Sequence, residues 1–247
     1  MISVDSLLYK IDQRLNKLSS NNHQKIQLED KILALNEAQL KLIKQKVDGT
    51  VTNTGLGFDS FKKRYDDLQN LVENYEKHEL DLEQIVAKDK NHLNQWFASL
   101  VPLTPQYLFY VDCYILANKG RCENKRIRVN SDLVKHADIQ ILLDNTNYKP
   151  SFEYEETFNV ITSDKVIIFT DGTFTPTKLY LSYIRYPQKI DKEGYIDFDG
   201  NPSKNQDCEL EAYLEDELLD LTVNALADYT ENVSAANSSQ LRMQTNE

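Results

Sequence analysis

The chain has few glycines, and their positions exclude the common phosphate-binding loops. Only seven occur among the 247 residues, and none is followed by Lys-Ser or Lys-Thr. Gly55-Leu-Gly57 lacks the third glycine of a dinucleotide-binding turn, and no strand pattern precedes it. Nucleotide binding through a glycine-rich loop is therefore disfavoured.

Cysteine and histidine are scarce as well. The cysteines are Cys113, Cys122 and Cys208, an odd number without a CxxC pair, so we expect isolated thiols rather than disulfides or a zinc site. The four histidines are scattered, and none forms the HExxH pattern of zinc proteases. No Gly-x-Ser-x-Gly sequence surrounds a serine. The sequence thus predicts no catalytic residue, no metal and no cofactor, although an active site without a short motif stays open.

Long apolar runs are missing. No stretch approaches the roughly 20 apolar residues that a membrane-spanning helix needs. The first five residues, Met-Ile-Ser-Val-Asp, provide no basic start, and no apolar stretch with a small-residue cleavage site follows them. We therefore expect no membrane partner, no secretion signal, and synthesis inside a cell.

Positive charge is lacking near the C-terminal end. Residues 191–247 contain fourteen acidic residues against Lys192, Lys204 and Arg242, which accounts for the whole net charge of −11. Because affinity for nucleic acid depends on cations that displace condensed counterions, this segment is not expected to bind DNA tightly. Two interpretations stay open: a solvated acidic helix face, or an acidic surface past which DNA slides without sticking.

Apolar residues at three- and four-residue spacing predict three helices in the first third of the chain. They cover residues 4–18 behind Ser3 as a possible N-cap, 26–47 and 58–75. Residues 80–100 fit a helix better than a strand, and Pro102 and Pro105 end this segment.

The middle of the chain has strand character. Residues 107–116 are rich in aromatic and branched side chains and predict a hairpin with residues 126–129. A helix is expected over 131–144, then strands over 157–162, 166–170 and 178–186. Residues 187–207 are polar and turn-rich, and Leu210 begins the apolar stripe of a last helix. After residue 232 the composition predicts an unfolded tail.

These elements predict an α+β fold. We expect a helical bundle, made from the N-terminal helices and the C-terminal helix, into which a small antiparallel β-sheet subdomain is inserted, with a flexible C-terminal tail. The predicted parts are the N-terminal helices over 1–105, the sheet subdomain with one helix over 106–190 and an acidic connection over 191–208. The C-terminal helix over 209–232 rejoins the bundle, and the tail covers 233–247.

Four stretches and the order of the predicted elements carry a resemblance: residues 26–40, 136–144 with 149–151, 179–187, and 208–210 with 215–226. They resemble the ring-forming connector (adaptor) proteins at the head-to-tail junction of tailed bacteriophages, in particular crAss-like phages that infect gut Bacteroidetes. The chain departs from the family at Thr146-Asn147-Tyr148, where an aromatic-rich Pro-Phe sequence is more usual.

The resemblance implies a non-enzymatic virion protein at the head-tail junction, assembled in the cytoplasm of the host bacterium. Its partners would be further copies of itself in a ring of roughly twelve, the portal protein and further tail ring proteins. Genomic DNA would pass through the lumen without tight binding. The acids that we expect to face the lumen are Glu211, Glu215 and Asp220. The candidate portal-binding tail contains Val233, Leu241, Arg242 and Met243.

Other functions fit the same sequence. The chain could be another virion component, such as a neck, tail-hub or cargo protein with the same sequence habits. A cytoplasmic helical interaction protein without a virion role is an alternative of a different class.

Overall fold

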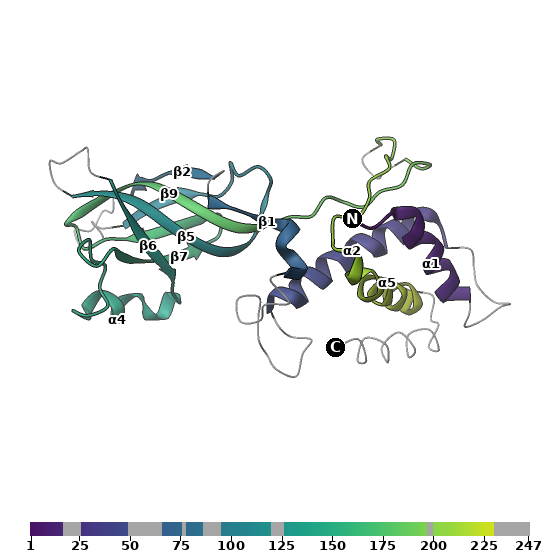
Figure 1. Ribbon diagram of the computed structural model, residues 1–247, viewed down its shortest axis with the longest axis horizontal. Coiled ribbons are helices and arrows are strands. Elements are labelled where there is room, and N and C mark those ends of the chain that lie inside the picture. Colours follow the sequence, from purple (N-terminus) through teal and green to yellow (C-terminus); the bar gives the residue numbers. More distant parts are fainter. Residues whose placement is uncertain are drawn as a thin grey trace. The chain divides into compact units, whose positions relative to one another are not determined.

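The computed structural model describes residues 1–16, 26–48, 66–75, 78–85, 95–119, 126–196 and 200–229 (Figure 1). The chain divides into two compact units. Residues 1–70 and 187–247, from the two ends of the chain, form the helical unit, and residues 71–186 form the sheet unit. Among the described residues, no helix has both the length and the apolar character needed to cross a bilayer.

Long helices build the described part of the helical unit. They are α1 (Val4–Asn16), α2 (Leu28–Asp48) and α5 (Glu215–Tyr229), and a short 3-10 turn, η6 (Ala212–Leu214), leads into α5. The apolar stripes that predicted these helices face the core of the unit, because hydrophobic residues at helical spacing share one face. Buried members of the stripes include Leu7, Ile11, Leu35, Ile43 and Leu218.

The start of the chain is tied to the segment that precedes α5. Ile2 and Cys208 exchange two backbone hydrogen bonds of 2.9 and 3.0 Å. The backbone N–H of Val4, at the first residue of α1, donates to Asp207 Oδ1 at 2.9 Å. Since the first amides of a helix have no partner within the helix, Asp207 caps α1 from across the chain.

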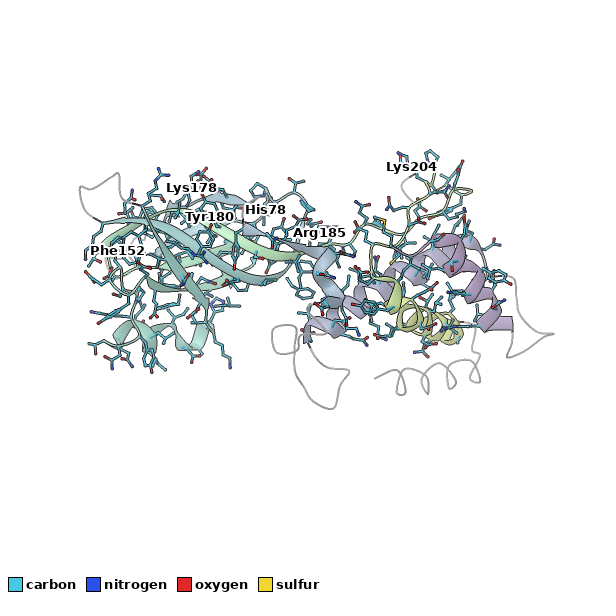
Figure 2. All side chains as sticks on the ribbon, in the orientation of Figure 1. His78, Phe152, Lys178, Tyr180, Arg185 and Lys204 are labelled. Atoms are coloured by element: carbon cyan, nitrogen blue, oxygen red, sulfur yellow. The ribbon has the colours of Figure 1, made fainter. Side chains whose placement is uncertain are left out.

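The described residues of the predicted acidic connection, 191–196 and 200–208, form a loop. Asp191 accepts hydrogen bonds from the backbone N–H groups of Lys192 and Lys204 at 2.8 Å and from the Tyr195 hydroxyl at 2.7 Å. Ser203 Oγ accepts from the N–H of Tyr195 and donates to its carbonyl oxygen. Lys204 is labelled on this loop in Figure 2. Two side chains therefore hold the loop closed at its base.

The sheet unit contains a nine-stranded sheet, preceded by the 3-10 turn η2 (Gln69–Leu71). Its strands are β1 (Val72–Glu73), β2 (Glu79–Asp81), β3 (Glu83–Gln84), β4 (Gln95–Ser99), β5 (Tyr107–Lys119), β6 (Ile127–Leu133), β7 (Glu156–Thr162), β8 (Lys165–Phe169) and β9 (Phe174–Arg185). The order is β1-β9-β5-β6-β7-β8-β4-β3, and β2 also pairs with β9. Among these described strands, β6 and β7 alone pair in parallel.

The sheet curls, and one short segment bridges its two ends. β2 pairs with β9, and β3, one residue further on, pairs with β4 at the other end of the strand order. The strands therefore enclose an interior, which is filled by apolar side chains such as Ile115, Ile168, Leu179 and Leu181, all fully buried.

A second, smaller core lies on the outer side of β7 and β8. The connection between β6 and β7, residues 134–155, contains η5 (His136–Asp138) and α4 (Ile139–Asp144), and we call it the α4 connection. Leu142 and Leu143 of α4 pack against Phe158 and Phe169 of the strands. Because β7 is covered on both sides, four consecutive residues of this strand are buried.

The prediction of a helical bundle with a small inserted antiparallel sheet is wrong. The sheet is large, curled and mixed, and its first strand begins at Val72. Residues that we predicted to be helical, 69–75 and 80–100, supply η2 and β1 to β4 instead. The short apolar runs in these residues fit the period of a helix as well as that of a strand. They form strands because β8 and β9 have backbone N–H and C=O groups that need hydrogen-bond partners. The predicted tail, residues 233–247, lies outside the described residues.

Candidate functional site

The three acids that we expected to face a lumen are held by other residues of the helical unit. Glu211 Oε1 accepts a hydrogen bond of 2.6 Å from Asn70 Nδ2. Glu215 Oε2 lies 2.6 Å from Lys10 Nζ, and Asp220 Oδ1 lies 2.5 Å from an Arg14 nitrogen. Asp220 is only 2% exposed, so its carboxylate does not lie on the surface of the subunit, where a lumen-facing acid would have to be.

The remaining acids in the first turn of α5 are also paired. Asp216 Oδ1 lies 2.6 Å from the guanidinium of Arg14. Glu217 shares the Lys46 ammonium with Asp67, at 2.7 and 3.2 Å. The cations come from α1 and α2, which the amino-acid sequence places more than 150 residues before α5. The solvated-face interpretation therefore overestimates the free charge of α5.

The candidate portal-binding residues Val233, Leu241, Arg242 and Met243 lie outside the described residues. Cys113 and Cys208, for which we expect isolated thiols, are free and buried. Burial raises the pKa of Cys113 to about 12 and that of Cys208 to about 11. Because the thiolate is the reactive form, these two residues are poor nucleophiles.

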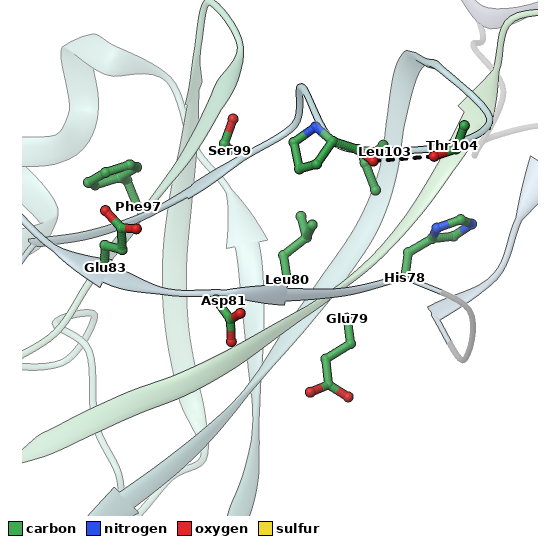
Figure 3. A pocket seen from close by; sticks show the side chains of 10 residues that line it. His78, Glu79, Leu80, Asp81, Glu83, Phe97, Ser99, Leu103 and Thr104 are labelled. Atoms are coloured by element: carbon green, nitrogen blue, oxygen red, sulfur yellow. Dashed lines mark hydrogen bonds between the residues drawn. The ribbon is translucent and has the colours of Figure 1, made fainter.

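The sheet unit has a pocket of about 450 Å³ where the bridging segment separates from β4 (Figure 3). Leu80 and Leu103, which are both buried, form its apolar base. Phe97 of β4 lies beside Glu83, its direct cross-strand partner in β3. We call this site the Phe97 pocket.

One carboxylate of the Phe97 pocket is placed differently from the other two. Glu79 and Asp81 both contact Lys178, with distances of 2.7 and 2.6 Å to its Nζ. The bonds from Lys178 and then from Tyr180 hold the pKa of Glu79 below its ordinary value. Glu83 makes no ion pair with any described residue, and Figure 3 shows its carboxylate next to the Phe97 ring, whereas Glu79 and Asp81 point away from that ring. Glu83 therefore gives the rim a negative charge.

His78 forms the other end of the pocket. It is 8% exposed, its ring packs edge-on against Tyr183 at a centroid distance of 5.0 Å, and its Nε2 lies 3.5 Å from Glu73 Oε2. Burial, followed by the negative charge of Glu73, raises the pKa of Tyr183 to about 12. Tyr183 donates its hydroxyl proton to the carbonyl oxygen of Pro105 at 2.6 Å. These residues make a packed wall.

The Phe97 pocket combines an apolar base with an acidic rim. It suits a guest that has an apolar body and a positively charged end, because the body leaves water and the charge meets Glu83. Sequence reasoning missed this site, since we predicted a helix over residues 80–100. Trp96 and Ala98 face the core, and Phe97 between them does not. This alternation is the pattern of a strand, and it could have revealed β4 in the sequence.

Large apolar side chains are also exposed on the α4 connection. Ile141, Tyr148 and Tyr154 are 66%, 67% and 80% exposed, although other residues of the connection pack on the outer core. Large apolar side chains that stay exposed on one connection are candidates for a protein contact surface.

Comparison with protein-family models finds no match, and comparison with curated proteins finds no similar sequence. Within the described residues, no three or more His, Cys, Asp and Glu side chains are arranged to hold a metal ion. The function of this chain is therefore inferred from the geometry of the subunit and from its sequence.

Proposed function

We propose that this chain is a structural subunit of a tailed-bacteriophage virion, a ring-forming connector that docks on the portal and joins the capsid to the tail. DNA passes through the lumen of the ring. The observation that carries the proposal is the exposure of large apolar side chains on the α4 connection of an otherwise well-packed sheet unit. A subunit that associates with copies of itself needs such surfaces.

In this proposal the helical unit binds the portal, and the sheet unit contacts other copies of the chain. Both ends of the chain belong to it, and residues 230–247 follow α5 directly in the sequence. The tail residues Val233, Leu241, Arg242 and Met243 would bind the portal in this arrangement. An apolar and cationic segment without strong local preferences can order on a partner surface.

Two of the three predicted lumen acids stay in the proposal. Glu211 and Glu215 are half-buried, and their positions beside Asn70 and Lys10 leave part of each side chain in solvent. Asp220 is removed, because it is buried. A reconstructed ring with both residues on its outer wall would contradict this part of the proposal.

The direct test is electron microscopy of the purified full chain, alone and mixed with portal protein. We expect rings with a single rotational symmetry, and a ring seated on the portal in the mixture. A chain that stays monomeric at every concentration and forms no complex with portal would refute the proposal. Copy number in purified virions separates a connector ring from a cargo protein.

The tail is tested by replacing Val233, Leu241, Arg242 and Met243 with serine together. We expect portal co-purification to be lost while the circular dichroism spectrum stays unchanged. The matched control replaces Ser238, Ser239 and Gln240 with alanine in the same tail. Equal portal binding by both variants would exclude a role for the apolar and cationic tail residues.

A further inference from the structure

We propose that copies of this chain associate head to tail through the sheet unit, with the turn at Tyr148 and Lys149 of one copy seated in the Phe97 pocket of the next. This inference rests on the proposed function and names the contact that would build the ring. The two surfaces belong to one unit of the structure, so the argument needs only the geometry of the sheet unit.

The guest is a preorganised turn. Asn145 organises it, because the backbone N–H of Asn147 donates to Asn145 Oδ1 at 3.0 Å and the N–H groups of Tyr148 and Lys149 donate to its carbonyl oxygen at 3.3 and 3.0 Å. Pro150, the next residue, is buried and anchors the end of the turn. A turn that is ordered before it binds loses less conformational entropy on association.

The turn has the chemistry that the pocket suits. The Tyr148 side chain is 67% exposed, and Lys149 beside it is exposed as well. An aromatic ring is a typical anchor at protein interfaces, and Leu80 and Leu103 offer it an apolar base. A volume of about 450 Å³ accommodates one large side chain and part of its neighbour.

The charges of the two surfaces are complementary. Lys149, like Glu83, makes no ion pair with a described residue of its own copy. Glu79 and Asp81 already share Lys178, so Glu83 is the carboxylate of the pocket that a cation from a second copy would meet. Lys165 of the same copy lies over the Phe97 ring, 4.6 Å from its centroid, and makes no ion pair with Glu83. Opposite charges across an interface select the partner and fix its register.

The positions of the two surfaces predict the symmetry. In Figure 1, β2, which lines the pocket, and α4, which leads into the turn, lie on opposite sides of the sheet unit. A contact between two different surfaces is heterologous, so each copy can bind one neighbour on either side. Such a contact generates a closed ring when the rotation between neighbours closes.

The test uses charge reversal in the full chain, with mass photometry and analytical ultracentrifugation as readouts of association. Glu83→Lys and Lys149→Glu are each expected to weaken association about tenfold or more, as loss of a central interface contact does. The double variant Glu83→Lys/Lys149→Glu is expected to recover it, because the charges are exchanged and remain opposite.

Mixing the two single variants gives the sharpest result. Each contact in the mixture can pair opposite charges if the copies alternate, so association is expected to return although neither variant associates well alone. Lys204→Glu and Glu193→Lys in the loop of the helical unit reverse exposed charges outside both surfaces. These matched controls are expected to associate as the unmodified chain does.

The outcomes distinguish failure of the head-to-tail contact from failure of the connector proposal on which it rests. Rings that form equally well with Glu83→Lys and Lys149→Glu, or impaired variants that mixing and charge exchange do not rescue, would overturn the head-to-tail contact and leave the connector proposal standing. An unmodified chain that forms no ring, alone or on portal, would overturn both.

Discussion

The helical unit and the sheet unit use their charged residues in different ways. In the helical unit, cations of α1 and α2 pair with acids of α5, as Lys10 does with Glu215 and Arg14 with Asp220. In the sheet unit, ion pairs join neighbouring strands, as Lys178 of β9 does with Glu79 and Asp81 of β2. Glu83 and Lys149 on the surface of this unit have no ionic partner among the described residues. Ion pairs in the helical unit thus join helices from the two ends of the chain, whereas those of the sheet unit join paired strands and leave Glu83 and Lys149 for a neighbour.

The two units also differ in the interactions that stabilise them. Curling of the sheet buries large aliphatic side chains between its strands, so transfer of apolar surface from water dominates there. The helical unit must hold together the two ends of the chain, and polar contacts that span more than 200 residues contribute to this. Substitutions in each unit therefore test whether the two units are stabilised in different ways.

The largest effect is expected in the core of the sheet. Leu179→Ala removes a fully buried side chain from β9 and should lower the free energy of unfolding by about 3 kcal/mol, because the cavity is only partly refilled. Urea unfolding followed by tryptophan fluorescence measures the change. Thr175→Ala on the exposed face of the same strand is the control and should change it by less than about 1 kcal/mol. Equal effects would contradict the assignment of the core.

A somewhat smaller effect is expected for the Arg14 ion pairs. Arg14→Met leaves the buried carboxylate of Asp220 without its guanidinium and should destabilise the helical unit by roughly 2 to 3 kcal/mol. The double variant Arg14→Met/Asp220→Leu should regain most of this, since neither charge is then buried. Far-UV circular dichroism during urea unfolding reports the change.

Lys31→Met is the matched control for Arg14. Its partner Asp12 is about half exposed, at a distance of 2.5 Å, so loss of this pair should cost less than about 1 kcal/mol. A cost for Lys31→Met as large as that for Arg14→Met would show that burial of the carboxylate does not decide the effect.

The helical unit is expected to weaken at alkaline pH through Cys208. Burial raises the pKa of this thiol from 9.0 to about 11, so the folded state holds the proton more tightly than the unfolded state. The resulting stabilisation is present in full below pH 9 and is lost as the pH rises through 11, a difference of about 2 kcal/mol. Unfolding at pH 8 and pH 11 should show this loss in the unmodified chain and a smaller loss in Cys208→Ala. An identical pH dependence would exclude Cys208 as its source.

The smallest effect concerns the cap of α1. Asp207→Ala removes the acceptor of the Val4 N–H and should cost about 1 kcal/mol. Asp207→Asn keeps a side-chain oxygen and should cost less. Hydrogen exchange in the first turn of α1 measures the change directly, and unaltered exchange rates in Asp207→Ala would show that the cap contributes little.

Local patterns in the sequence predicted most long elements. The helices over 4–18 and 26–47 are found as α1 and α2, and the strands over 107–116, 157–162 and 166–170 are found as β5, β7 and β8 with small shifts at their ends. The hairpin of β5 with β6 is confirmed. Each has a stripe or an alternation long enough to distinguish a helix from a strand.

The short strands were missed for a physical reason. β1, β2 and β3 have two or three residues each, too few for any period to show, and their ladders are with β9 and β4. The parallel pairing of β6 with β7 was missed because it depends on the α4 connection, which returns the chain to the same end of the sheet. The Phe97 pocket lies among these missed elements.

Local sequence patterns identified the long elements α1, α2, α5, β5, β7 and β8, the faces of these elements that are buried, and the accumulation of acids before and within α5. The tertiary structure decided how the sheet curls, which cations meet the acids of α5, and where Glu83 and Lys149 lie. The reason is that periodicity is a property of neighbouring residues, whereas ion pairs, ladders and pockets form between residues that only folding brings together.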